Sequence, residues 1–128
     1  MKKIIFTLLF STLVFSSPSY ADWMKEGTTV SGNTYYVDLD RIRKHDGYVY
    51  YWVLEDLLKP TQYGDLSGKV YMQGDCKLFR YKILSSTYYT QPMARGTYSA
   101  TGNNPEKEWT YIAPNSVAEV PIKIACSR

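Results

Sequence analysis

The stretch Tyr48-Val49-Tyr50-Tyr51-Trp52-Val53-Leu54 decides the fold. Its residues are almost wholly aromatic or β-branched, the types that favour β-strands. Apolar side chains occupy both of its alternating faces, which is typical of a central strand that is covered on both sides. The preceding Asp46-Gly47 pair favours a tight turn. The sequence therefore predicts a central strand that is entered through a turn.

Further strands are predicted on both sides of this run. Residues 34–38 should form a short strand, and residues 40–43 a single helical turn or a loop. After a loop at 57–68, which contains one proline and two glycines, strands are expected at 69–75 and 77–89. These segments favour an antiparallel sheet.

The strand expected at 77–89 is amphipathic. Phe79, Tyr81 and Ile83 share one face, while Arg80 and Lys82 share the other. Cys76 falls on the side of the basic residues, which is awkward for a buried cysteine. We therefore expect a β-bulge near Gly74 that turns Cys76 inward.

The last third of the chain predicts an irregular segment followed by a helix. Short strands are expected at 97–100 and 109–112. Ser116 and Glu119 form a capping box, so a helix should begin there, with Pro121 as its kink. The predicted fold class is α+β, an antiparallel β-sheet backed by a C-terminal helix.

Cys76 and Cys126 are the only two cysteines. An even count in an exported protein points to a disulfide, here closing a loop of about 50 residues with a stabilisation of roughly 4 kcal/mol. The alternative is a redox pair or a thiol nucleophile. No Cys-x-x-Cys motif supports it, and His45 is the only histidine that such a thiol has for a partner.

Residues 1–21 carry the features of a cleavable secretion signal. Met1-Lys2-Lys3 is positive, and residues 4–15 form an apolar run that is too short to span a bilayer, which takes roughly 20 residues. Small residues at Ser19 and Ala21 suit a signal peptidase; a buried N-terminal helix is the alternative. We expect a mature domain at 22–128 with no transmembrane segment and no lipid anchor, located in the periplasm, at the cell surface or in the medium.

Net charge and length limit the classes of function that the chain can have. The formal net charge is +3, and Lys2 and Lys3 belong to the signal, so the mature chain is close to neutral. Nucleic-acid binding needs a basic field that neutralises several phosphates, so no nucleic-acid partner is expected. The basic residues at 41–45 are interpreted as a solvated turn. The length allows one domain with one core.

No motif for catalysis, cofactor binding or metal binding is present in the sequence. Asp38 and Asp40 are too few oxygen ligands for a metal ion and are interpreted as turn and cap residues. Glu55 and Asp56 point to opposite faces of a strand, and His45 has no linked serine. We therefore predict no enzyme, with no catalytic, cofactor or metal residues. An unrecognised hydrolase would need an acidic cluster that the sequence does not reveal.

The chain is rich in aromatic residues, with thirteen tyrosines and three tryptophans. Such residues stabilise half-buried sheet surfaces and also populate binding faces. If Tyr88, Tyr89, Tyr98 and Trp109 gather on one solvent face, they form a recognition patch. Otherwise they cover the edge of the core, and the sequence leaves both interpretations open.

The order of these features resembles a known family. It is carried by Tyr35-Tyr36-Val37-Asp38, the strand at 48–54, Ser67 with Lys69, Asp75-Cys76-Lys77, Tyr88-Tyr89, Met93, Gly96, Trp109, Pro114, Ser116 and Cys126. From about Trp23 to Cys126 this order is similar to the surface-adhesin protein E domain family of Gram-negative bacteria.

The resemblance implies an antiparallel sheet backed by a helix, with the two cysteines joined. It also implies a non-enzymatic exported domain that binds proteins of the extracellular matrix, or of the envelope. The family's named member is lipid-anchored, whereas this chain lacks the lipid-acceptor cysteine. The alternative is therefore a soluble periplasmic accessory or structural protein without a host-adhesion role, for example a homodimer joined along a sheet edge.

Overall fold

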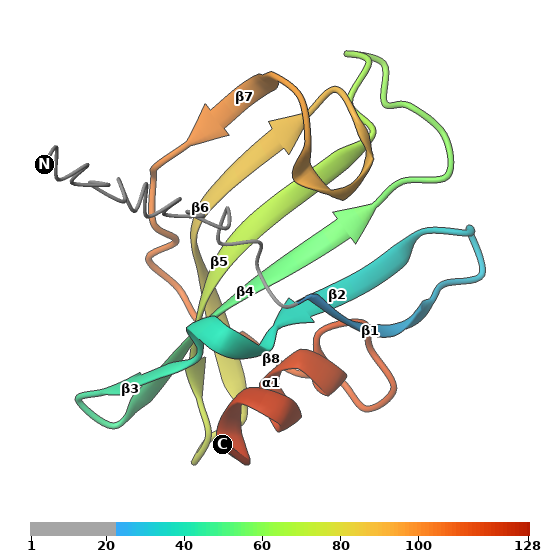
Figure 1. Ribbon diagram of the computed structural model, residues 1–128. Helices are drawn as coiled ribbons and strands as arrows, with labels where there is room; N and C mark the ends of the chain where they lie inside the picture. The colour runs from blue at the N-terminus through green and yellow to red at the C-terminus, as the bar shows by residue number, and fades with distance from the viewer. Residues whose placement is uncertain (1–22) are drawn as a thin grey trace, which may run out of the picture.

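The computed structural model describes residues 23–128, in which eight strands form one antiparallel sheet with a helix on one face (Figure 1). The strand order is β1-β2-β4-β5-β6-β7, with β3 also beside β4 and β8 also beside β6. The elements are β1 (Trp23–Thr28), β2 (Thr34–Asp38), the 3-10 turn η1 (Leu39–Arg41), β3 (Arg43–His45), β4 (Tyr48–Asp56), β5 (Ser67–Asp75), β6 (Arg80–Tyr89), the 3-10 turn η2 (Pro92–Ala94), β7 (Tyr98–Gly102), β8 (Thr110–Tyr111) and α1 (Glu119–Cys126). The predicted fold class is confirmed.

Strand β4 is the predicted central strand. It pairs with β5 on one side, and with both β2 and β3 on the other. Val49 and Tyr51 are buried on the side that faces α1. The prediction that both faces are covered is wrong for most of the other side. There Tyr48, Tyr50 and Trp52 are only half-buried, while Leu54 at the strand end is fully buried.

Helix α1 begins later than predicted. The predicted start at Ser116 is wrong, because residues 114–118 form turns outside the helix, which begins at Glu119. Pro121 then occupies the first turn, where its missing N–H is not needed, so the expected kink at the fifth helical position does not arise. Ile122 and Ala125 are fully buried against the sheet.

Gly74 allows this close approach of helix and sheet. A Cβ atom at this position would lie 2.9 Å from Val49, 3.1 Å from Tyr51 and 3.2 Å from Ile122. The residue thus makes room for the helix, and the bulge predicted near it is wrong. The irregularity in the pairing of β5 with β6 lies instead beside Tyr71, opposite the segment from Ile83 to Ser85.

Cys76 and Cys126 form a disulfide. Cys76 lies in the turn between β5 and β6 rather than in a strand, so the parity problem that motivated the bulge does not exist. Asp75 fixes this turn by accepting hydrogen bonds from the N–H groups of Lys77 and Leu78 and from the Arg80 side chain. The disulfide therefore connects the end of α1 to a rigid turn.

Strands β1 and β3 were not predicted, and the strand expected at 97–100 is found as β7 at 98–102. The predicted turn at Asp46-Gly47 is present, with both residues in the left-handed region. The signal peptide expected at 1–21 lies outside the described residues.

Candidate functional site

The face of the sheet opposite α1 carries alternating aromatic and cationic side chains. Strand pairing places Tyr50 beside Gln73 and Trp52 beside Tyr71. Side chains alternate between the two faces of a sheet, so these paired residues of β4 and β5 all point to this side. We call this the open face and define it by ten residues: Arg43, Tyr48, Tyr50, Trp52, Lys69, Tyr71, Arg80, Lys82, Tyr89 and Trp109.

The aromatic rings of the open face contact one another. The centroids of Trp52 and Tyr71 lie 4.7 Å apart in a stacked arrangement, and those of Tyr50 and Tyr71 lie 6.1 Å apart. Trp109 packs on Tyr48 with a centroid distance of 5.3 Å. These separations are within the range in which aromatic pairs attract each other. The rings therefore form a firm surface of large, half-buried side chains.

Cations lie over these rings. The Lys69 amine is 4.9 Å from the Trp52 ring and 5.8 Å from the Tyr89 ring. Arg80 and Lys82 lie 4.5 Å and 4.7 Å from the Trp109 ring. Each contact is within the distance of a cation–π interaction. The rings therefore help to hold these cationic side chains in place on the surface.

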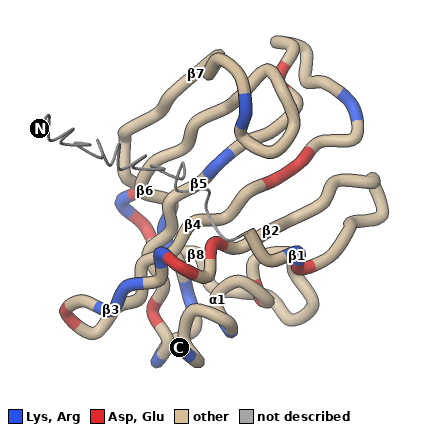
Figure 2. Tube along the Cα trace, viewed as in Figure 1, with Lys and Arg blue, Asp and Glu red and all other residues tan. Residues whose placement is uncertain are grey.

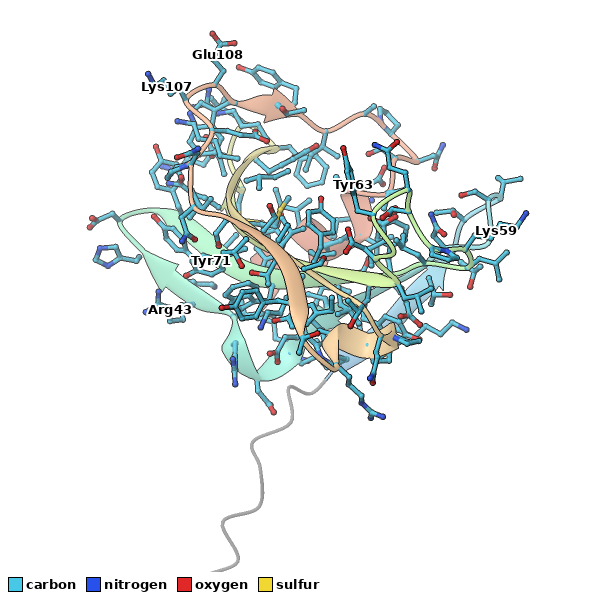
Figure 3. The ribbon with its side chains drawn as sticks, turned by 90° about the horizontal axis from the view of Figure 1, so that it is seen from above. Arg43, Lys59, Tyr63, Tyr71, Lys107 and Glu108 are labelled. Atoms are coloured by element: carbon cyan, nitrogen blue, oxygen red, sulfur yellow. A yellow bond between two sulfur atoms is a disulfide. The ribbon has the colours of Figure 1, made fainter. Side chains whose placement is uncertain are left out.

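Arg43 extends the positive charge to β3 (Figure 2). Its guanidinium donates a 2.9 Å hydrogen bond to the Tyr71 hydroxyl, and Figure 3 shows the two side chains on the same side of the molecule. Together with Lys44, His45 and Tyr50 they line a hollow of about 430 Å³. Within residues 23–128, none of Arg43, Lys69 and Lys82 forms an ion pair.

Arg80 is the cation of the open face that is paired. It forms a 2.9 Å ion pair with the buried Asp75. Burial acts to raise the pKa of Asp75, but the hydrogen bonds from Arg80, Leu78 and Lys77 outweigh it and lower that pKa. Asp75 therefore stays ionised and holds the guanidinium against Trp109.

One end of the open face is closed by the loop at 91–96. Met93 and Ala94 have φ angles of 60° and 55°, which is strained for non-glycine residues. Their N–H groups donate to Asp56 and to the fully buried Ser67, whose hydroxyl also donates to the carbonyl of Gln91. These bonds hold the loop against β4 and β5 and leave the rest of the open face free.

The structure divides the four aromatics that the sequence had grouped. Tyr89 lies on the open face beside Lys69, and Trp109 lies near Tyr48 and Arg80. Tyr88 packs over Gly68 on the opposite face, and Tyr98 is 68% exposed on β7. The four do not form one patch. Sequence analysis missed Tyr50, Trp52 and Tyr71, although their alternation along two strands was a visible signal.

The candidate acidic groups have structural contacts. Asp38 accepts a 3.0 Å hydrogen bond from the N–H of Asp40, which confirms the interpretation as a cap. Glu55 accepts from Asn33, whereas Asp56 accepts from the strained loop at Met93. His45 is exposed beside Asp46. In residues 23–128 no three histidine, cysteine or acidic side chains are placed to hold a metal ion.

Comparisons with known proteins agree with this fold. A solved structure of Haemophilus influenzae protein E has a TM-score of 0.66 and 16% identity, covering 82% of this chain and 83% of that one. Protein E from non-typeable Haemophilus influenzae gives 0.59 and 15%, covering 87% and 79%. The chain has no significant match among curated protein sequences. In the described part of the chain, no helix has the length and apolarity to cross a membrane.

The comparison with family models shows to which family the chain belongs. The model of the family described as surface-adhesin protein E matches residues 23–127, which covers every strand of the sheet and all of α1. The two cysteines that the resemblance implied to be joined lie within this range and are bonded. The chain therefore belongs to the surface-adhesin protein E family.

Proposed function

We propose that this chain is an exported, non-enzymatic binding domain that recognises a protein partner through its open face. The observation that carries the proposal is the set of stacked rings together with Lys69 and Lys82, which form no ion pair within residues 23–128. Tryptophan, tyrosine and arginine are the residues in which interface binding energy is concentrated. The rings and cations are also ordered before binding, so a partner loses little of its binding energy to immobilising them.

The charge of the open face indicates the nature of the partner. Arg43, Lys69 and Lys82 present positive charge that no acid of residues 23–128 neutralises. Complementary surfaces place opposite charges across an interface, which speeds encounter and fixes orientation. The partner is therefore a protein with an acidic surface, of the extracellular matrix or of the envelope. The family supports the adhesin role.

Export is part of the proposal. The segment at 1–21 would direct the chain across the inner membrane, and residues 22–128 would form the working domain. Its location decides which partners it meets. We would measure the protease accessibility of tagged protein on intact cells and assay the medium beside it. Signal at the surface or in the medium supports host adhesion, and a purely periplasmic result limits the partner to the envelope.

Binding is tested with the mature chain and two alanine variants. Trp109→Ala removes the ring that Arg80 and Lys82 cover. Tyr63→Ala removes a 77% exposed ring in the loop between β4 and β5, which is not one of the open-face residues and which Figure 3 shows apart from Arg43 and Tyr71. If the open face is the interface, Trp109→Ala weakens binding by about 2 kcal/mol or more, roughly 30-fold, and Tyr63→Ala leaves it unchanged. Equal losses, or none, would refute the assignment.

Salt dependence gives a second measurement. Lys82→Gln should slow association and reduce its sensitivity to ionic strength, since the charge acts mainly on encounter. Lys59→Gln is the matched control, because Lys59 lies in the β4–β5 loop, away from the open face (Figure 3). An association rate that both variants leave unchanged would argue against an acidic partner.

A further inference from the structure

A cavity lies on the helix side of the sheet, on the opposite face from the one just described. It has a volume of about 430 Å³ and lies between the sheet and the segment at 110–121. Val53, Val70 and the buried Met72 form its apolar floor, while Tyr111 and Val117, which are 65% and 46% exposed, form its rim. This volume is within the range of small-molecule sites, and the exposed rim gives access from solvent.

Two buried hydroxyl groups, on residues that line this cavity, have no hydrogen-bond partner within residues 23–128. Tyr51 is fully buried, and its hydroxyl is unpaired within residues 23–128. The Oγ of Ser116 is also buried and unpaired, and both residues line the cavity. Buried polar groups in native proteins almost always have partners. Two orphaned hydroxyls at one apolar cavity therefore point to a ligand that carries a polar group.

A half-buried carboxylate next to the cavity indicates the charge of that polar group. A smaller hollow of about 140 Å³ adjoins the cavity and shares Tyr35, Ser116 and Val117 with it. Glu26 lines this hollow, and its Oε1 is buried without a partner in the described part of the chain. Burial raises the pKa of Glu26 to about 7. In the described part of the chain, no lysine, arginine, histidine or aspartate lines either hollow.

We infer that this cavity binds a compound with an apolar body and a protonated amine head. The apolar body packs on Val53, Val70 and Met72, and the ammonium group forms an ion pair with Glu26 where the two hollows meet, next to Ser116, which lines both. A carboxylate head would meet the negative charge of Glu26, and an uncharged head would leave that charge unpaired in an apolar site.

The charge of Glu26 predicts the pH dependence of binding. The titratable residues that line the two hollows besides Glu26 are tyrosines, with Tyr35 and Tyr51 facing it and Tyr81 and Tyr111 farther along the cavity. A primary amine stays protonated below pH ~10. Raising the pH from 5.5 to 8 ionises Glu26 and leaves the amine charged, so amine binding should strengthen.

The test measures calorimetric binding of three probes of equal chain length to the mature chain: decylamine, decanoate and decanol, each below its aggregation limit. We expect one decylamine per chain at pH 8, with at least 10-fold tighter binding than either other probe, and a smaller preference at pH 5.5. Glu26→Gln should remove the preference for the amine. Glu119→Gln should keep it, because that carboxylate pairs with Lys123 outside the cavity.

Three outcomes would overturn the inference. The first is equal binding of the three probes, which would show a general apolar site. The second is no binding of any probe by a folded monomer. The third is a dimer that excludes all probes, with Val117→Asp restoring the monomer, which would show that a second copy covers the rim. The Glu26 pKa, measured by NMR, should fall when decylamine binds. These results are independent of the proposed function, since the cavity and the open face lie on opposite sides of the sheet.

Discussion

Removing the disulfide should cost this small domain much of its stability. Cys76 and Cys126 are separated by 50 residues in sequence. The chain-entropy model gives about 4 kcal/mol for a loop of that length, against a typical total of roughly 5–15 kcal/mol. The perturbation is the double variant Cys76→Ala and Cys126→Ala. We expect its free energy of unfolding to fall by about 4 kcal/mol.

Urea denaturation followed by circular dichroism measures this loss. If the disulfide acts on the unfolded state, the unfolded chain expands when the bond is absent and the denaturant slope rises. Wild-type protein kept reduced is the control, because it loses the bond and keeps both side chains. A loss below about 1 kcal/mol with an unchanged slope would refute the reasoning.

Hydrogen exchange separates the effect on the folded state. Helix α1 has eight residues, too few to be stable alone, and is held by the buried Ile122 and Ala125 as well as by the disulfide. If packing suffices, amides of α1 in the double variant exchange at the rate of global unfolding. Faster exchange confined to α1 would show that the bond anchors the helix, and the entropic account would then be wrong.

Three further changes test other parts of the fold. Gly74→Ala should cost about 1–3 kcal/mol in thermal unfolding, because the new Cβ would lie 2.9 Å from a buried side chain, whereas Gly27→Ala meets nothing within 4 Å and should not overpack. Glu26 has a pKa near 7 when folded and near 4.5 when unfolded, so stability should fall as pH rises from 4.5 to 7. With its partial exposure, Glu26→Gln should then gain about 1–2 kcal/mol at pH 8 and nothing at pH 4, as melting temperatures against pH would show. Ser67→Ala removes the hydroxyl that accepts from Ala94, and should cost about 1–3 kcal/mol in urea denaturation and speed amide exchange at 91–96.

Local chemistry was enough to predict the centre of the fold. The β-branched and aromatic run at 48–54 has no good alternative to a strand, and it forms one of the inner strands, β4, with partners on both sides. Asp46-Gly47 supplies the two left-handed residues that its hairpin turn requires. The two cysteines in an exported chain had one way to pair. In each of these three cases the residue types themselves, without contacts from elsewhere in the chain, favour a single structure.

Other features depend on contacts between distant residues. Strand β1 has the sequence WMKEGT, which lacks the alternation of apolar and polar residues that is typical of a strand. It is a strand because its backbone pairs with the edge of β2. The capping box at Ser116 was a weaker signal than Pro121, whose missing N–H suits the first helical turn and sets the start at Glu119. The alternation of side chains along β4 and β5 that forms the open face was visible in the sequence. The contact between Trp52 and Tyr71 was not, because it depends on the register in which the two strands pair.

The same register separates the two candidate sites. Alternation along β4 sends Tyr51 to the cavity and its neighbours Tyr50 and Trp52 to the open face, so one strand serves both sides of a single layer. Stacking fixes the rings of the open face, whereas the Tyr51 hydroxyl has no hydrogen-bond partner among residues 23–128. The open face is therefore suited to a rigid protein surface and the cavity to a small molecule. Because the two sites lie on opposite faces of the sheet and share no lining residue, Trp109→Ala should leave decylamine binding unchanged, and Glu26→Gln should leave protein binding unchanged.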